Sequence, residues 1–238
     1  MTATTQPTSA HPLGRSSDFL ARISETDRAA LLALSARKDL RKGELIYKAG
    51  DPSTHVYFLE TGRAKIFYLN PTGKEVVLWM CMPGELFGVT EIFQAHKRQT
   101  AAQIAEHAQL LMVTREAFLG FIQERPHLAM GVMELLANRM RDLGNMVKEL
   151  VANDVTGRVV NLIARLGARY GRRQGDEVVL DMNITHQEIA DMIGTSRQTV
   201  TTTLNMLKRQ GTLNFRGRRI CIAQQDLLER EKTGESQG

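Results

Sequence analysis

The chain has 238 residues and a formal net charge of +5, with 42% hydrophobic and 24% charged residues. This composition is typical of a globular protein and unlike that of a disordered or fibrous chain. No apolar run approaches the ~20 residues that a membrane-spanning helix needs, which argues against a membrane protein. The length exceeds that of most single domains and predicts two. Cys81 and Cys221 lie far apart and indicate no disulfide framework, which favours the reducing cytoplasm.

The two ends of the chain are expected to be disordered. Residues 1–17 are polar and lack the apolar stretch of a signal peptide, and residues 231–238 form a short polar tail. Ordered structure is expected from Asp18. The first capped helix begins at Ser24, because Ser24 and Asp27 resemble a capping box ahead of an apolar run.

Residues 40–113 change to short runs of β-branched and aromatic residues, which predict strands. Glycines punctuate these runs at intervals of 7 to 12 residues, as turns of an antiparallel barrel or roll would: Gly43, Gly50, Gly62, Gly73 and Gly84. Within this segment "GELFGVTEIF" (84–93) indicates a strand, a glycine turn and the start of a helix. Backbone N–H groups at such a turn can hold an anion.

A long helix is expected after "TREAFLGFIQERP" (114–126), and it carries a heptad pattern. Its apolar residues alternate in steps of four and three: Ala129, Met133, Leu136, Met140, Leu143, Val147 and Leu150. Such a seam over three heptads predicts a two-stranded coiled coil, and hence a dimer axis. The alternative is one long helix that packs only on its own domain.

Residues 184–211, "ITHQEIADMIGTSRQTVTTTLNMLKRQG", carry the most specific signal in the chain. Thr185 and Glu188 form a capping box that starts one helix, and Ser196 caps a second helix after a sharp turn at Gly194. Two helices with this spacing form a helix-turn-helix, whose second helix enters the major groove. The core positions are Ile189, Ile193, Val200, Leu204 and Leu207. The exposed first turns of the second helix carry Arg197, Gln198, Thr201 and Thr202.

Two short strands around Arg216 and Gly217 follow, with Arg218 and Arg219 beside the turn. A basic hairpin after a helix-turn-helix is a wing. Residues 154–230 hold 12 Lys and Arg against 8 Asp and Glu. The stretch 197–219 contains six basic residues and no acid, which favours a polyanion as partner. The residues therefore predict a winged helix-turn-helix that binds double-stranded DNA; a helical hairpin with no role in DNA binding is the alternative.

The order of these parts resembles the CRP/FNR family, the catabolite activator protein and its relatives, from about Asp18 to Leu228. The motifs "KGELIYKAGDP", "PGELFG", "DVTGRV" and "ITHQEIADMIGTSRQTV" carry the resemblance. It implies an α+β chain with a cyclic-nucleotide-binding-like antiparallel β-roll (18–126), a dimerisation helix (127–153) and a winged helix-turn-helix (154–230). It also implies a homodimeric transcription factor on a near-palindromic operator, with half-sites about one helical turn apart. RNA polymerase is the further partner implied for an activator, through the basic loop "ARYGRRQGDE" (168–177).

The resemblance assigns roles to residues of the DNA-binding domain. Arg197 matches an arginine that reads a guanine edge, which suits a bidentate guanidinium. Gln198 and Thr202 stand where catabolite activators have a glutamate and an arginine. Because glutamine favours adenine, we expect another half-site. The positions that match phosphate contacts, which set register rather than sequence, are Thr185, Gln187, Ser196, Thr199, Arg216 and Arg218.

The sensor turn departs from the cyclic-AMP pattern of the family. Cyclic-AMP binders carry a glutamate after "FG", a later Arg-Ser pair and a Thr-Ser pair on the dimer helix. This chain has Val89, Arg98 followed by Gln99, and Leu143 followed by Gly144 at those positions.

The turn is more similar to that of the family's 2-oxoglutarate-sensing nitrogen regulators. That similarity implies a small anionic effector held by Gly88, Val89, Thr90, Arg98 and Arg139, because paired guanidinium groups clamp carboxylates. A 2-oxo acid, a cyclic dinucleotide and a cyclic mononucleotide are the candidate effectors. A sensor that binds no ligand is the alternative, with both arginines in surface or inter-subunit ion pairs.

Other classes of function have less support in the sequence. No phosphate loop, nucleophile elbow or metal motif is present, so we expect neither an enzyme nor a metal site. Two cysteines cannot supply the four thiolates of an iron–sulfur cluster. A nucleotide-sensing regulatory subunit of a signalling enzyme is the second hypothesis. It would need no basic winged domain, and residues 184–219 argue against it.

Overall fold

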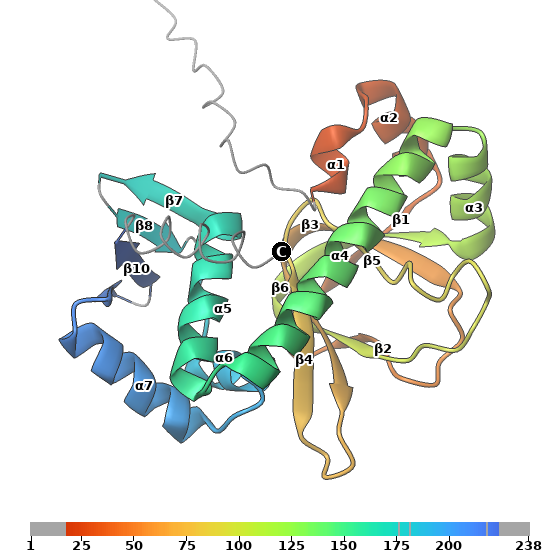
Figure 1. The fold of residues 1–238 in the computed structure, drawn as a ribbon. Helices are drawn as coiled ribbons and strands as arrows, with labels where there is room; N and C mark the ends of the chain where they lie inside the picture. Colours follow the sequence, from red (N-terminus) through yellow and green to blue (C-terminus); the bar gives the residue numbers. More distant parts are fainter. Residues whose placement is uncertain (1–17, 176, 181, 218, 224–238) are drawn as a thin grey trace, which may run out of the picture.

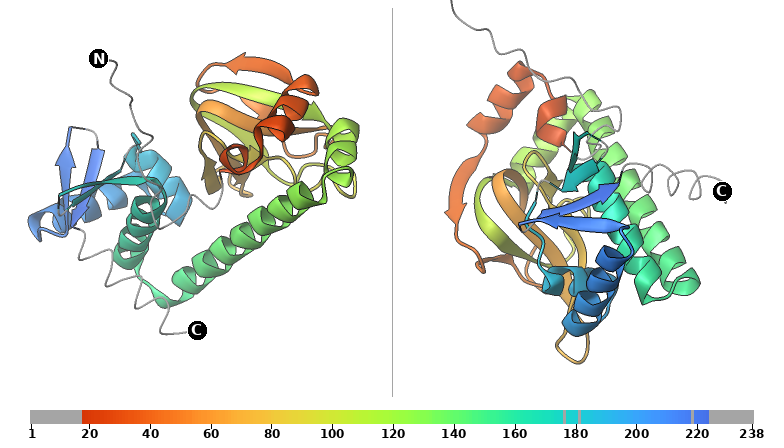
Figure 2. Two further views of the ribbon diagram at one scale, coloured as in Figure 1. Left: turned by 90° about the horizontal axis from the view of Figure 1, so that it is seen from above. Right: turned by 90° about the vertical axis from the view of Figure 1, so that its left-hand side faces the viewer.

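The computed structural model describes residues 18–175, 177–180, 182–217 and 219–223. Two lobes lie at opposite ends of one long helix, α4 (Pro126–Ala152), as Figures 1 and 2 show. None of the helices in these ranges combines the length and the hydropathy of a membrane span. The expected termini 1–17 and 231–238 lie outside the described residues.

The first lobe is an antiparallel roll with a six-stranded sheet. Its central strands follow the order β1-β6-β3-β4, while β2 pairs with β6 and β5 pairs with β3. The strands are β1 (Ala36–Leu40), β2 (Leu45–Tyr47), β3 (His55–Leu69), β4 (Glu75–Cys81), β5 (Leu86–Phe87) and β6 (Ala101–Thr114). This arrangement confirms the predicted antiparallel sheet of the sensor domain.

The prediction that Gly62 forms a turn between strands is wrong. Strand β3 runs through it, and the pairing with β6 shifts register on both sides of Gly62. Gly62 has a φ of 80°, and a Cβ atom there would lie 2.1 Å from the backbone oxygen of His107. It is therefore a bulge inside one long strand. A turn and a bulge both favour glycine, so composition alone does not separate them.

Three short helices and the first half of α4 cover one face of the roll: α1 (Phe19–Arg22), α2 (Glu25–Ala33) and α3 (Arg115–Gln123). Ser24 caps α2 by accepting a hydrogen bond from the Asp27 amide at 3.0 Å. Asp27 also pairs with Arg125 and His127 at the start of α4, with distances of 3.1 and 2.9 Å. These contacts fix α4 against the sensor domain.

The second lobe is a helical core with a four-stranded sheet in the order β7-β8-β10-β9. Its elements are α5 (Val155–Tyr170), β7 (Gly171–Gln174), β8 (Glu177–Leu180), α6 (His186–Ile193), α7 (Arg197–Arg209), β9 (Leu213–Arg216) and β10 (Arg219–Ala223). Asp154 caps α5 as predicted, at 2.8 Å from the Gly157 amide. The predicted basic loop is wrong in part, since residues 171–174 form strand β7, which pairs with β8.

The two lobes are in contact as well as joined by α4. Met192 of α6 packs against an apolar cluster on β3, β4 and β6. Lys74 in the β3–β4 turn donates to the carbonyl oxygen of Thr195 at 2.6 Å. Arg63 of β3 lies 3.8 Å from the carboxylate of Glu188. Helix α6 of the second lobe therefore rests on the sheet of the first.

Candidate DNA-binding surface and sensor turn

Helices α6 and α7 form the predicted helix-turn-helix. The capping box is complete, because Thr185 Oγ1 accepts from the Glu188 amide at 3.1 Å and the Glu188 carboxylate accepts from the Thr185 amide at 2.7 Å. Ser196 caps α7 by accepting from the Thr199 amide at 3.1 Å. Gly194, in the left-handed conformation with φ 72°, ends α6.

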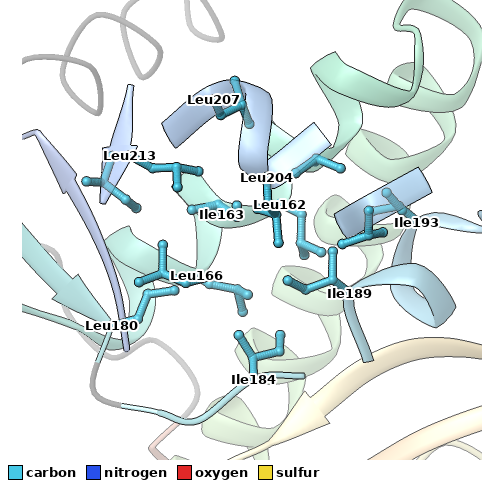
Figure 3. Packing of buried hydrophobic residues seen from close by; sticks show 14 of the residues in the cluster. Leu162, Ile163, Leu166, Leu180, Ile184, Ile189, Ile193, Leu204, Leu207 and Leu213 are labelled. Carbon is cyan, nitrogen blue, oxygen red and sulfur yellow. The ribbon is translucent and has the colours of Figure 1, made fainter. Parts of the chain in front are cut away.

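A compact apolar core holds α7 against α5 and α6, and Figure 3 shows it from close by. Every core position predicted from the sequence belongs to this cluster: Ile189, Ile193, Val200, Leu204 and Leu207. Leu162, Ile163 and Leu166 of α5 complete its centre, and Leu213 adds the wing. The inner face of α7 is thus fully used for packing, which leaves its outer face to solvent.

The outer face of α7 presents three of the four predicted base-reading residues. Arg197, Gln198 and Thr202 are exposed. Thr201 is half-buried instead, because its hydroxyl donates to the Arg197 carbonyl at 2.9 Å and lies 2.8 Å from His186 Nδ1. A hydroxyl engaged in this way is less available to a base edge.

The predicted phosphate-contacting residues surround this face. Thr185, Gln187 and Ser196 are exposed, and Thr199 is half-buried. The amide group of Gln187 donates to Asp191 at 2.8 Å. Arg216 on β9 binds Gln174 at 3.2 Å and Glu177 at 2.7 Å. Arg218 lies outside the described residues.

The sensor turn follows the two-residue strand β5. Gly88 has a φ of 71°, and a Cβ atom there would lie 3.0 Å from the Tyr57 ring and 3.3 Å from Arg98 Nη1. Val89 is fully buried in the apolar core, and Thr90 is exposed. Because the Val89 side chain packs inward, Val89 can offer only its backbone to a ligand.

Arg98 lies directly behind the turn and is 2% exposed. Its Nη1 donates to the Gly88 carbonyl at 2.7 Å, and its Nη2 donates to the His55 carbonyl. The guanidinium also stacks on the Tyr47 ring at 4.4 Å. Arg98 thus lies beside Gly88, as expected. Most of its N–H groups, however, already donate hydrogen bonds to acceptors within the domain.

Glu91 is a residue of this site that sequence reasoning did not assign. It is 8% exposed and lies 3.2 Å from Arg98 Nη1, so it forms a buried ion pair there. Its second oxygen accepts from the Gln99 amide at 3.3 Å. The sequence did contain a signal for this role: Glu91 stands three residues after Gly88, and that spacing brings its carboxylate back to the turn.

Arg139 reaches the same turn from α4. It is 7% exposed, and its Nη2 donates to the Leu86 carbonyl at 2.6 Å, two residues before Gly88. The guanidinium lies 5.0 Å from the centre of the Trp79 ring, and Nη1 has no hydrogen-bond partner among the described residues. Two arginines therefore flank the turn, one from the roll and one from the long helix.

Cys81 lies near Arg139 and does not add an anion to the site. Burial raises the pKa of the Cys81 thiol to about 12, although the nearby Arg139 opposes this shift. The thiol therefore stays protonated at neutral pH. Within the described ranges, no cluster of three or more His, Cys, Asp or Glu side chains could hold a metal ion.

The outer face of α4 is apolar over most of its length. The predicted seam residues Met133, Met140, Leu143, Val147 and Leu150 are exposed, with Met140 at 72% and Val147 at 61%. Leu136 is half-buried and packs against the roll. Large apolar side chains exposed in a row on a helix are costly in water and mark an interaction surface.

Two family models match the two lobes. The cyclic nucleotide-binding domain matches residues 37–125, and the Crp-like helix-turn-helix domain matches residues 157–231. The cyclic AMP receptor protein of Thermus thermophilus is 30% identical over 200 residues, which cover 83% of this chain and 89% of that protein. The chain belongs to the CRP/FNR family of transcriptional regulators.

Other CRP/FNR proteins resemble it over a similar length. The global nitrogen regulator of a Nostoc species is 27% identical over 194 residues, or 81% of this chain and 87% of that protein. The structure of the c-di-GMP responsive global regulator CLP of Xanthomonas campestris shares the fold, with a TM-score of 0.72, 21% identity, and coverage of 84% of this chain and 99% of that one. As a CRP/FNR protein, the chain is a DNA-binding transcriptional regulator with a cyclic-nucleotide-binding-like sensor domain.

Proposed function

We propose that this CRP/FNR protein acts as a homodimer that binds a near-palindromic operator through Arg197, Gln198 and Thr202. The observation that carries the proposal is the combination of two free surfaces. The first turns of α7 are exposed around a fully packed core, and the seam of α4 is exposed although it is apolar. Pairing two copies along α4 covers the seam and gives the two recognition helices the symmetry of a palindrome.

The proposed reading residues differ in chemistry. Arg197 can bind the O6 and N7 of guanine with two hydrogen bonds, and Gln198 suits adenine. Thr185, Ser196, Thr199 and the wing set the position on the phosphates. The proposal also places the protein in the cytoplasm. It includes contact with RNA polymerase, since an operator-bound activator works beside the polymerase.

A small anion at the sensor turn is the proposed effector. Arg139 supports this, because its buried Nη1 is an unused donor beside the Leu86 carbonyl. An anion that binds there would contact both the roll and α4, and could shift the dimer between two states. A 2-oxo acid, a cyclic dinucleotide and a cyclic mononucleotide remain the candidates.

A second candidate is a regulator that needs no ligand, and Glu91 favours it. The carboxylate of Glu91 already neutralises Arg98 inside the domain. An anion that approached Arg98 would meet this like charge at short range, which is unfavourable. In this version the pair of Glu91 and Arg98 takes the place of an effector.

DNA selection tests the main proposal. The wild-type protein is incubated with a random duplex library, and bound DNA is sequenced. We expect a two-part motif with its halves about one helical turn apart. Arg197→Ala should lose about 1–3 kcal/mol of discrimination per half-site, with little change on random DNA. Arg28→Ala is the matched control: it removes an exposed arginine of α2, outside the proposed DNA-binding surface, and should leave the selected motif unchanged. Equal motifs from Arg197→Ala and the wild type would contradict the proposal.

Thermal unfolding with 2-oxoglutarate, cyclic AMP and cyclic di-GMP separates the two versions of the sensor. A ligand that binds only the native state raises the midpoint, by the equivalent of about 2.7 kcal/mol at one hundred times its Kd. The gated version predicts a rise with one compound, which Arg139→Gln abolishes. The ligand-free version predicts no rise with any compound and operator binding without additives.

A further inference from the structure

A cavity of about 590 Å³ lies where the two lobes meet α4, and its lining contains none of the residues proposed to hold an effector at the sensor turn. Strand β4, helices α4 and α5, and Met192 of α6 line it. This volume falls in the range of sites that hold small organic ligands. The cavity is apart from the apolar seam, because α4 contributes Asn138, Arg141 and Asn145 here rather than its seam residues.

One wall of the cavity is aromatic and apolar. Trp79 and Tyr170 both line it, together with leucine and methionine side chains. The pKa of the Tyr170 phenol is raised well above its usual value, first by burial and then by the nearby Glu85, so the ring stays neutral. Its hydroxyl donates to Glu85 at 3.2 Å. Such rings favour a flat, aromatic partner by stacking or edge contact.

The polar wall contains three arginines, and two of them have carboxylate partners. Arg165 pairs with Glu149, and Arg169 lies 3.2 Å from Asp142 and 3.4 Å from Glu85. Arg141 is exposed and donates to the Asn138 side chain.

Within the part of the chain that the structure describes, no carboxylate pairs with Arg141. Its planar guanidinium is therefore available to an incoming carboxylate or phosphate.

We propose that this cavity binds a small molecule with an aromatic ring system and one anionic group. The ring lies against Trp79 and Tyr170, and the anionic group binds Arg141. Such a ligand contacts the sensor sheet, the long helix and the DNA-binding domain at once. It therefore stabilises the present orientation of the two lobes. The cavity is a second ligand site with a lining of its own, and its Trp79 and Tyr170 contact Arg139 and Glu85 beside the sensor turn. An aromatic carboxylic acid and a nucleotide share this chemistry.

Trp79 is the only tryptophan in the chain, so its fluorescence reports on this wall. The full-length protein is titrated with benzoate, with guanosine monophosphate and with inorganic phosphate, with correction for absorbance. We expect a saturable change with benzoate or guanosine monophosphate and none with phosphate. Whichever of these two compounds binds with the lower Kd shows whether the ligand is an aromatic carboxylic acid or a nucleotide. No saturable change with either aromatic anion, or the same change with phosphate alone, overturns the proposal.

Three variants locate the binding. Arg141→Gln should weaken it by about tenfold or more, since a charged hydrogen bond contributes about 1.5–3 kcal/mol. Arg28→Gln removes an exposed arginine outside the cavity and should leave it unchanged. Ala168→Leu places bulk in the cavity without a change of charge and should also weaken binding. Circular dichroism checks that each variant is folded.

The sensor turn provides the last control. Thr90→Glu places a negative charge on the exposed side of the turn, where it repels an anion bound there, and should leave the titration of the cavity unchanged. A signal that survives Arg141→Gln and Ala168→Leu but disappears in Thr90→Glu would assign the ligand to the turn, and would overturn the second site. DNA selection is a separate readout, so failure here does not depend on failure of the proposed operator binding.

Discussion

Removal of the Arg98 guanidinium is expected to destabilise the sensor domain strongly. Arg98→Met keeps much of the side-chain length but deletes the hydrogen bonds to the carbonyl groups of Gly88 and His55. It also leaves the carboxylate of Glu91, which is 8% exposed, without its partner at 3.2 Å. Breaking a buried ion pair from one side costs about 3–5 kcal/mol, because the remaining charge stays desolvated.

A double-mutant cycle separates the ion pair from the other contacts of Arg98. Glu91→Gln should cost less than Arg98→Met, because the guanidinium keeps its two backbone carbonyl partners. In the double variant no unpaired carboxylate remains, so its loss should be smaller than the sum of the two single losses. The expected coupling is about 0.5–3 kcal/mol.

Urea unfolding provides the assay, with Trp79 of β4 as the reporter of the sensor domain and circular dichroism as the second probe. The reasoning fails if Arg98→Met costs less than about 1 kcal/mol, the range of an exposed ion pair. It also fails if the two single losses add to within about 0.5 kcal/mol, which is the behaviour of independent sites.

Three further predictions concern the sensor domain. Gly62→Ala should lower the free energy of unfolding by more than about 1 kcal/mol in urea, because φ is 80° and a Cβ atom would lie 2.1 Å from the His107 oxygen. The hydrogen bond from His127 is the largest cause that lowers the pKa of Asp27 below 3.8, so this pair stabilises the protein above that pH and is lost as the pH falls through the lowered value. Asp27→Asn should therefore flatten the acid side of a melting-temperature profile; an unchanged slope would argue against the pair. Cys81, fully buried with a pKa raised to about 12, should react with a thiol reagent only after unfolding, and rapid labelling of the native protein would contradict its placement.

Local signals explain why the helix-turn-helix could be predicted closely from sequence. Thr185, Glu188, Gly194 and Ser196 act within a few residues of where they stand, and their caps and turn are all present. The apolar spacing of α6 and α7 likewise determines which faces are buried. The heptad residues from Ala129 to Leu150 all lie within α4, which begins three residues before them and ends two residues after them.

Contacts between distant segments account for what the sequence did not predict. Strand β7 forms because β8 supplies its pairing partner, and residues 171–174 alone carry too little hydrophobic pattern to indicate a strand. The contact of Lys74 with the Thr195 carbonyl joins positions 121 residues apart. Glu91 was visible in the sequence, but its pairing with Arg98 depends on how the loop between them folds.

Native mass spectrometry of the protein on a selected operator duplex tests the central claim most directly. We predict two chains per duplex for the wild type, and loss of this complex when one half-site is scrambled or when Arg197 is replaced by alanine. Met140→Glu, which places a charge in the exposed apolar seam, should also abolish the two-chain complex. A single chain per duplex, or equal binding to intact and scrambled sites, would contradict the dimeric, sequence-reading regulator proposed above.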